Sequence, residues 1–250
     1  MAHYELIIFF FIIAFIYSSV GFGGGSSYLA LLALYSFPYQ ELRFIALACN
    51  IIVVTGGTII FILHKELNWR KVIPLVITSI PLSFLGATLK ISQNTFFLLL
   101  GITLIISSLL LWISNRSDQT TPSEASSKSN IFLNMGLGGV IGFISGMVGI
   151  GGGIFLSPLL NLYKWDTSKK IAATASVFIL VNSMSGIAGQ LKTIPSTFDV
   201  SAITLLCIAV FAGGQLGSRI SAIKFNHLVI RRMTAVLVFA AGVEVLVKHI

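Results

Sequence analysis

Charged side chains, above all acidic ones, are scarce in this chain. Asp and Glu together number 8 among 250 residues, and charged residues of both signs make up 10%, whereas a typical soluble domain has about 25%. So few charges exclude an ordinary soluble globule, a disordered chain and a nucleic-acid binder that depends on a charged surface. Hydrophobic residues make up 56%. The composition therefore predicts an all-α integral membrane protein with several spans.

Cysteine is rare, and the motifs of several enzyme classes are missing. Cys49 and Cys207 lie in apolar runs without the Cys/His spacing of a zinc site, so we predict buried thiols and no metal. The chain contains no GxxxxGK[ST] motif for ATP and no HExxH or GxSxG motif for an intramembrane hydrolase. We therefore expect that the protein is not an enzyme and that it has no cofactor and no nucleic-acid partner.

Apolar segments fill most of the remaining chain. A membrane-spanning helix needs about 20 residues, so the second and seventh segments are too short to cross without tilt, and each follows a glycine cluster. The ten segments are residues 5–20, 27–37, 43–63, 71–89, 96–114, 131–148, 154–163, 171–189, 198–218 and 228–247.

A polar segment divides the chain into two similar halves. Residues 115–130 are rich in Ser and Thr and contain Pro122, which is typical of a linker. We predict a first transmembrane repeat over 1–114, a polar cytoplasmic linker over 115–130, and a second repeat over 131–250. A shift of 128 residues places Gly23, Gly24 and Gly25 on Gly151, Gly152 and Gly153; with one gap, IALA at 45–48 meets AATA at 172–175. An internal duplication of this kind is typical of transporters.

The distribution of Lys and Arg indicates how the halves are oriented. If the first two segments of each half form a hairpin, the halves have inverted topology, and the cations divide twelve to four between the two sides. If each glycine-linked pair is one broken span, the halves are parallel and the division is nine to seven. The positive-inside rule favours the inverted arrangement with both termini outside. Under it, the four outer cations are Arg43, Lys90, Lys192 and Lys248.

The two glycine clusters are the strongest signal for a binding site. They lie in SSVGFGGGSS (18–27) and GMVGIGGG (146–153), and a new apolar segment begins after each. Such a break points free backbone N–H groups and the positive end of a helix dipole into the membrane, where they can bind an anion without a charged side chain. The alternative is a close-packing surface between helices.

The motifs resemble those of the sulfite exporter TauE/SafE family. The resemblance rests on GFGGGSS and GIGGGIFLSPLL, each followed by a small-residue stretch, ALACN (46–50) and ATASV (173–177), and it covers nearly the whole chain. The first motif departs from the second in having Ala30 where the second has Pro158. The resemblance implies an integral membrane transporter of sulfur-containing or organic anions, such as sulfite, sulfonates or sulfoacetate.

Polar residues inside the apolar segments are further candidates for substrate contacts, because polar groups in lipid mark either a transport route or contacts between helices. Packing, snorkelling to the interface and interfacial exposure are the alternatives for them. His64 and Glu244 are candidates for proton coupling. The candidate substrate-binding residues are Gly23, Gly24, Gly25, Ser26, Ser27, Asn50, Gly151, Gly152, Gly153, Ser176, Asn182, Gln215 and Arg219.

These observations predict a secondary carrier in the inner membrane that moves a small anion by alternating access. A membrane scaffold or an anion channel is the alternative. The expected partners are the anion, membrane lipid and a second copy of the chain in a homodimer.

Overall fold

The computed structural model describes residues 4–19, 22–114, 130–191, 200–220 and 227–249. Within these ranges the chain forms ten helices and no strand, which confirms the all-α prediction. Most of the predicted linker, residues 115–129, lies outside the described residues. The helices are α1 (Tyr4–Ser19), α2 (Gly25–Leu34), α3 (Tyr39–Leu63), α4 (Trp69–Thr88), α5 (Gln93–Ile113), α6 (Ile131–Val148), α7 (Gly153–Leu162), α8 (Ser168–Gln190), α9 (Val200–Ile220) and α10 (His227–His249).

Several helices begin before the apolar runs that predicted them, because polar residues cap their first turns. The Ser92 side chain accepts a hydrogen bond from Thr95 N ahead of α5, at 3.2 Å. The Thr167 side chain accepts one from Lys170 N ahead of α8, at 3.5 Å. Capping satisfies N–H groups that have no partner within the helix, so the helix extends into polar sequence that hydrophobicity alone does not assign to it.

The lengths and composition of the helices fit a multi-pass membrane protein. Among the described residues, six helices are long and apolar enough to cross a membrane: α3, α4, α5, α6, α8 and residues 201–219 of α9. Helices α1, α2 and α7 are shorter, with 16, 10 and 10 residues. Large apolar side chains such as Ile77, Leu109 and Phe132 point outward and are exposed, as expected where the surrounding solvent is lipid.

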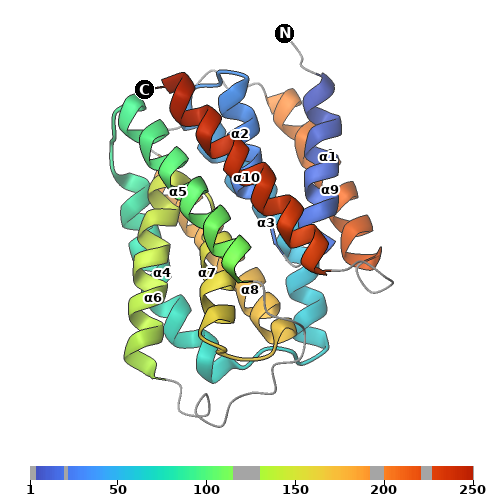
Figure 1. Ribbon diagram of the computed structural model, residues 1–250, viewed down its shortest axis with the longest axis vertical. Helices are drawn as coiled ribbons and strands as arrows, with labels where there is room; N and C mark the ends of the chain where they lie inside the picture. Colours follow the sequence, from blue (N-terminus) through green and yellow to red (C-terminus); the bar gives the residue numbers. More distant parts are fainter. Residues whose placement is uncertain (1–3, 20–21, 115–129, 192–199, 221–226, 250) are drawn as a thin grey trace.

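The helices pack in pairs that correspond between the two halves (Figure 1). Helix α4 packs along α6, and α1 packs along α9, with α5 and α10 crossing the face between them. If α1–α5 are matched in order with α6–α10, the α4–α6 contact becomes the α9–α1 contact. The α3–α8 and α5–α10 contacts map onto themselves. The packing is therefore unchanged when the halves are exchanged.

Glycine stripes bring the outer helix pairs close together. Gly138, Gly142 and Gly146 of α6 lie against the backbone of Leu75, Ser79 and Ser83 of α4 in the same order along both helices, so α4 and α6 run parallel. An ideal Cβ on Gly142 would lie 2.7 Å from the carbonyl oxygen of Ser79. Backbones this close require small residues at the contact.

The other outer pair uses the same device, with the glycines on α9. Gly213 lies against Phe11 O and Gly217 against Phe15 O, so α1 and α9 also run parallel. In contrast, Gly101 of α5 contacts Leu246 and Leu104 contacts Gly242 of α10, which makes α5 and α10 antiparallel.

Candidate functional site

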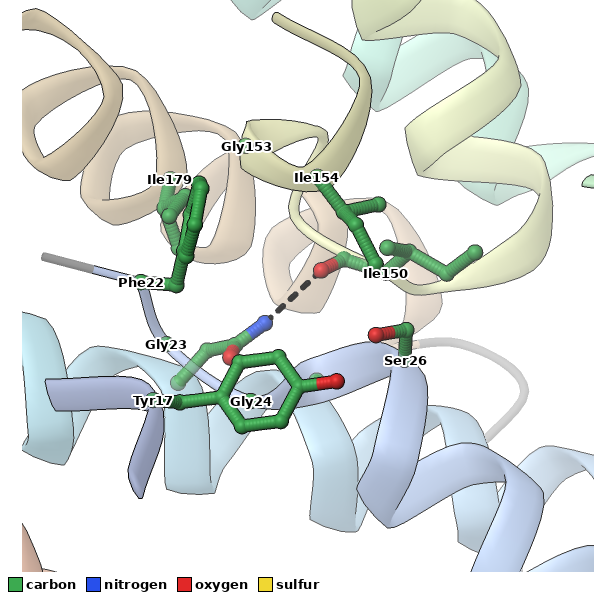
Figure 2. Close-up of a pocket in the computed structure, with 11 residues that line it drawn as sticks. Tyr17, Phe22, Gly23, Gly24, Ser26, Ile150, Gly153, Ile154 and Ile179 are labelled. Carbon is green, nitrogen blue, oxygen red and sulfur yellow. Dashed lines mark hydrogen bonds between the residues drawn. The ribbon is translucent and has the colours of Figure 1, made fainter. Parts of the chain in front are cut away.

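The two glycine motifs, which are 128 residues apart in the chain, lie against each other in the structure. An ideal Cβ on Gly25 would lie 2.7 Å from Ile150 O, and one on Gly151 would lie 2.8 Å from Asn50 Nδ2. Asn50 extends from α3 into the space between the motifs and donates a hydrogen bond from Nδ2 to Ile150 O, at 2.9 Å. Figure 2 shows this bond joining the two halves.

The short helices α2 and α7 both begin at this contact, and they begin in the same way. Each is preceded by a glycine in the left-handed conformation, Gly24 and Gly152, both with φ of 83°. An L side chain is strained there. Gly24 O accepts from Ser27 N and Tyr28 N, and Gly152 O accepts from Phe155 N and Leu156 N. The backbone N–H groups that precede these donors in the first turn of each helix have no partner within the helix.

A cavity lies where the two helix N-termini meet. It has an empty volume of about 210 Å³, part of it open to solvent, and Tyr17 and Ser26 face Ile150 and Ile154 across it (Figure 2). Its lining comes from both halves of the chain: Tyr17, Phe22, Gly23, Gly24, Gly25, Ser26, Asn50, Ile150, Gly153, Ile154 and Ile179. Free amides and two positive helix ends at one cavity form a suitable environment for an anion.

Polar groups around the cavity are buried and incompletely paired. Asn50 is fully buried, and its Oδ1 has no hydrogen-bond partner among the described residues. An Asn side chain has two N–H donors, and Ile150 O takes one of them. Ser183 is also fully buried, its Oγ is unpartnered, and it lies 2.9 Å from an ideal Cβ on Gly151. Unpaired buried polar groups are costly, so these atoms are candidates to bind a ligand.

The remaining residues of the two motifs lie close by, with more local partners. Ser27 bonds to the Tyr17 hydroxyl, at 2.6 Å. Gly152 is packed by Phe178 and Ile141. Ser176 is buried on α8 but does not line the cavity.

Asn182 differs from Asn50 in the direction of its bonding. Its Nδ2 donates to Phe178 O of its own helix, at 2.8 Å, and its backbone carbonyl accepts from Ser83 Oγ of α4. The neighbouring Ser183 is the residue that meets the glycine motif. One residue along a helix rotates the side chain by about 100°, which explains why two adjacent polar residues face different neighbours.

The other four candidate residues do not line the cavity. Gln215 of α9 is half-buried and packs its amide against Gly56 of α3. Arg219 is exposed in the last turn of α9. His64 is exposed at the end of α3, with Nδ1 3.0 Å from Ile60 O, and Glu244 is exposed on α10. The roles of these residues stay predictions.

The contacts also correct the register in which the two halves were aligned. Gly25 lies against Asn50, and the matching Gly153 lies against Ile179; Gly23 lies against Val54, and Gly151 against Ser183. Ile179 therefore matches Asn50, and Ser183 matches Val54, each with a shift of 129 residues. The alignment of residues 45–48 with 172–175 has a shift of 127, so it is wrong by two. The glycines were matched correctly, but the alignment of the apolar stretch that follows them was ambiguous because small and aliphatic residues recur throughout it.

The charge distribution predicts that Arg43 is one of the outer charges, but the structure places it in the interior. It is 3% exposed, and its Nη2 donates to Gly146 O at 2.9 Å and to Ala87 O at 3.3 Å. Both carbonyls lie in the last turn of a helix, α6 or α4, where the negative end of the dipole attracts a cation. The side chain therefore enters the space between the halves instead of reaching the membrane surface.

A family model for the sulfite exporter TauE/SafE matches residues 6–245, which confirms the resemblance. The chain is 32% identical over 241 residues to the probable membrane transporter protein y4hK of Sinorhizobium fredii, covering 96% of this chain and 97% of that protein. It is 27% identical over 234 residues to the probable membrane transporter protein MJ0441 of Methanocaldococcus jannaschii, covering 86% and 85%. No solved structure gives a significant match.

Proposed function

This chain belongs to the sulfite exporter TauE/SafE family, and from that premise we propose that it is a secondary transporter for a small sulfur-containing or organic anion in the inner membrane. The observation that carries the proposal is the convergence of two glycine-capped helix N-termini, one from each half, on one cavity. The names of its relatives also indicate a membrane transporter and not an enzyme.

The anion, of the sulfite, sulfonate or sulfoacetate type, binds between α2 and α7. Backbone amides at Gly25, Ser26 and Gly153 receive its oxygens, and the two helix dipoles supply positive potential. Asn50 orients the anion through the amide hydrogen that Ile150 does not take. Oxyanions suit this site because it offers several donors in a small space, and none of the described residues that line it carries a carboxylate that would repel them.

The two halves are inverted repeats, each opened by a re-entrant hairpin. The antiparallel packing of α5 on α10 supports this arrangement, because a two-fold axis in the membrane plane reverses the direction of each helix it exchanges. The parallel pairs α4–α6 and α1–α9 exchange with each other under the same operation. In this topology both termini lie outside, and α1–α2 and α6–α7 enter from opposite sides.

Alternating access follows from the position of the site between the repeats. One half moves against the other, and the cavity opens first to one side and then to the other. The Asn50–Ile150 bond joins the halves, so it must break or shift in each transport cycle.

His64 and Glu244 are our candidates for coupling to protons, and the measurement is anion flux driven by an imposed pH gradient in His64→Gln and Glu244→Gln.

A thermal-shift panel on the purified protein tests the site. Sulfite, sulfate, sulfoacetate, taurine and acetate are compared at constant ionic strength, since a ligand that binds the native state raises its melting temperature. We expect selective stabilisation by one sulfur oxyanion, and loss of that stabilisation in Gly24→Val and Gly152→Val. Gly136→Val is the matched control, because a Cβ at Gly136 meets nothing within 4 Å.

Flux into proteoliposomes then separates the carrier from its alternatives. Saturable flux of the stabilising anion is expected. Absence of flux would favour a scaffold, and flux that never saturates would favour a channel. Normal anion binding in both glycine variants would contradict the site.

A further inference from the structure

Arg43 is a buried cation that the proposed site does not use. It lies seven residues before Asn50 on α3, which is about 10 Å along the helix axis toward the end where α3 begins. Its aliphatic portion packs against Gly149, where an ideal Cβ would lie 3.1 Å from Arg43 Cβ and Cγ. Gly149 has φ of 85° and begins the GIGGG run of the second glycine motif. The Arg43 side chain is thus packed beside the segment that leads into the cavity.

The charge of Arg43 is only partly balanced. Among the described residues, the ion pairs join Lys71, Lys169 and Lys170 to carboxylates, and none includes Arg43. A guanidinium has five N–H donors. Nη2 uses its donors on the carbonyls of Ala87 and Gly146, and the buried Nε has no partner among the described residues.

A buried charge without an ionic partner is costly, and the helix ends offset that cost only in part. Ionisable residues inside a membrane protein commonly mark a route for substrate or ions. The second half of the chain shows what occupies the matching position. In the register set by the glycine contacts, Ala172 occupies the place of Arg43, so the duplication does not require a cation there.

We propose that Arg43 is a second anion-binding residue of the transport route, lying between the end where α3 begins and the glycine-motif cavity. This inference rests on the proposed function. The Nε–H, which has no partner among the described residues, donates to an oxygen of a sulfonate, sulfite or carboxylate group, and the guanidinium supplies the positive charge. The residue favours a fully charged anion over a neutral molecule of the same shape, because a neutral ligand leaves the guanidinium uncompensated.

The test measures binding of sulfite and sulfoacetate to the purified full-length protein. Arg43→Gln keeps an amide that can donate to Gly146 O but removes the charge. Arg43→Lys keeps the charge but loses the Nε–H donor. We expect affinity for the anion that stabilises the wild type to fall at least 10-fold in Arg43→Gln and about 3-fold in Arg43→Lys.

The control is Lys71→Gln, which also removes a largely buried cation, one that is paired with Asp166 at 3.2 Å. It should lower the melting temperature without the ligand and leave anion affinity unchanged. If Arg43 only caps α4 and α6, Arg43→Gln will bind the anion as the wild type does, and the inference is overturned. If the wild type binds neither anion, the proposed function fails, and this inference fails with it.

Discussion

Helices α3 and α8 hold matching places in the two halves, yet they present different chemistry to the glycine motifs. Helix α3 sends Asn50 across to Ile150 and buries Arg43 beside Gly149. Helix α8 places Ile179 where α3 has Asn50. The Asn182 amide of α8 donates within its own helix, to Phe178 O. The helix packing and the backbone of the glycine motifs are therefore repeated, whereas most of the side-chain chemistry at the cavity comes from the first half.

The start of α8 should matter mainly for stability. Asp166, just before α8, lies 3.2 Å from Lys71 and 3.7 Å from Lys170, and its side chain is 6% exposed. Asp166→Asn leaves the buried Lys71 without a carboxylate and should cost about 3 kcal/mol, near the lower end for a broken buried pair. Thermal unfolding measures the loss. Anion affinity that fell along with stability would show that this end of α8 is also part of the site.

The amide of α3 should matter mainly for binding. Asn50→Ala removes the bond to Ile150 and a donor to the anion, which we expect to weaken binding about 30-fold, or about 2 kcal/mol. Asn182→Ala is the matched control on α8, and it should change affinity less than about 3-fold because its amide bonds within its own helix. Equal losses in the two variants, measured by ligand titration, would contradict the difference between the helices.

A carboxylate added beside Arg43 should compete with the anion. Tyr39 is half-buried and precedes Arg43 by four residues on α3, a spacing at which side chains meet on one helix face. We expect Tyr39→Asp to pair with Arg43 and weaken anion binding about 10-fold, or about 1.4 kcal/mol. Tyr39→Asn removes the same aromatic ring without adding charge, so unchanged affinity in both variants would exclude Arg43 as a binding residue.

The helices and the glycine motifs could largely be predicted from the sequence, because they depend on local features. Apolar runs gave ten segments that the structure forms as ten helices in the described residues. The repeated GxGGG pattern marked the place where the halves meet, since few residues other than glycine tolerate φ near 83°.

What could not be predicted depends on tertiary packing. The burial of Arg43 requires the ends of α4 and α6, which lie 44 and 103 residues away in the sequence. The choice between Asn182 and Ser183 depends on a rotation of one residue about α8. Tyr17 and Phe22 line the cavity only because the α1–α2 hairpin folds back. None of these facts has a periodic signal in the sequence.

Ser183 offers the smallest and most specific test of the comparison. It takes the place on α8 that Val54 has on α3, because each lies against the first glycine of a GGG motif. Ser183→Val therefore makes α8 match α3 at this point; a methyl group replaces the hydroxyl and a second methyl is added, so the side chain is larger. If the unpartnered Ser183 hydroxyl binds the anion, its loss should weaken affinity about 3-fold, or about 0.7 kcal/mol. Val54→Ser is the reverse change. If it strengthens binding while Ser183→Val weakens it, the difference in side-chain chemistry, and not the repeated backbone, sets the affinity of each half-site. If neither variant changes the affinity, the N-termini of α2 and α7 bind the anion without a contribution from these two positions of α3 and α8.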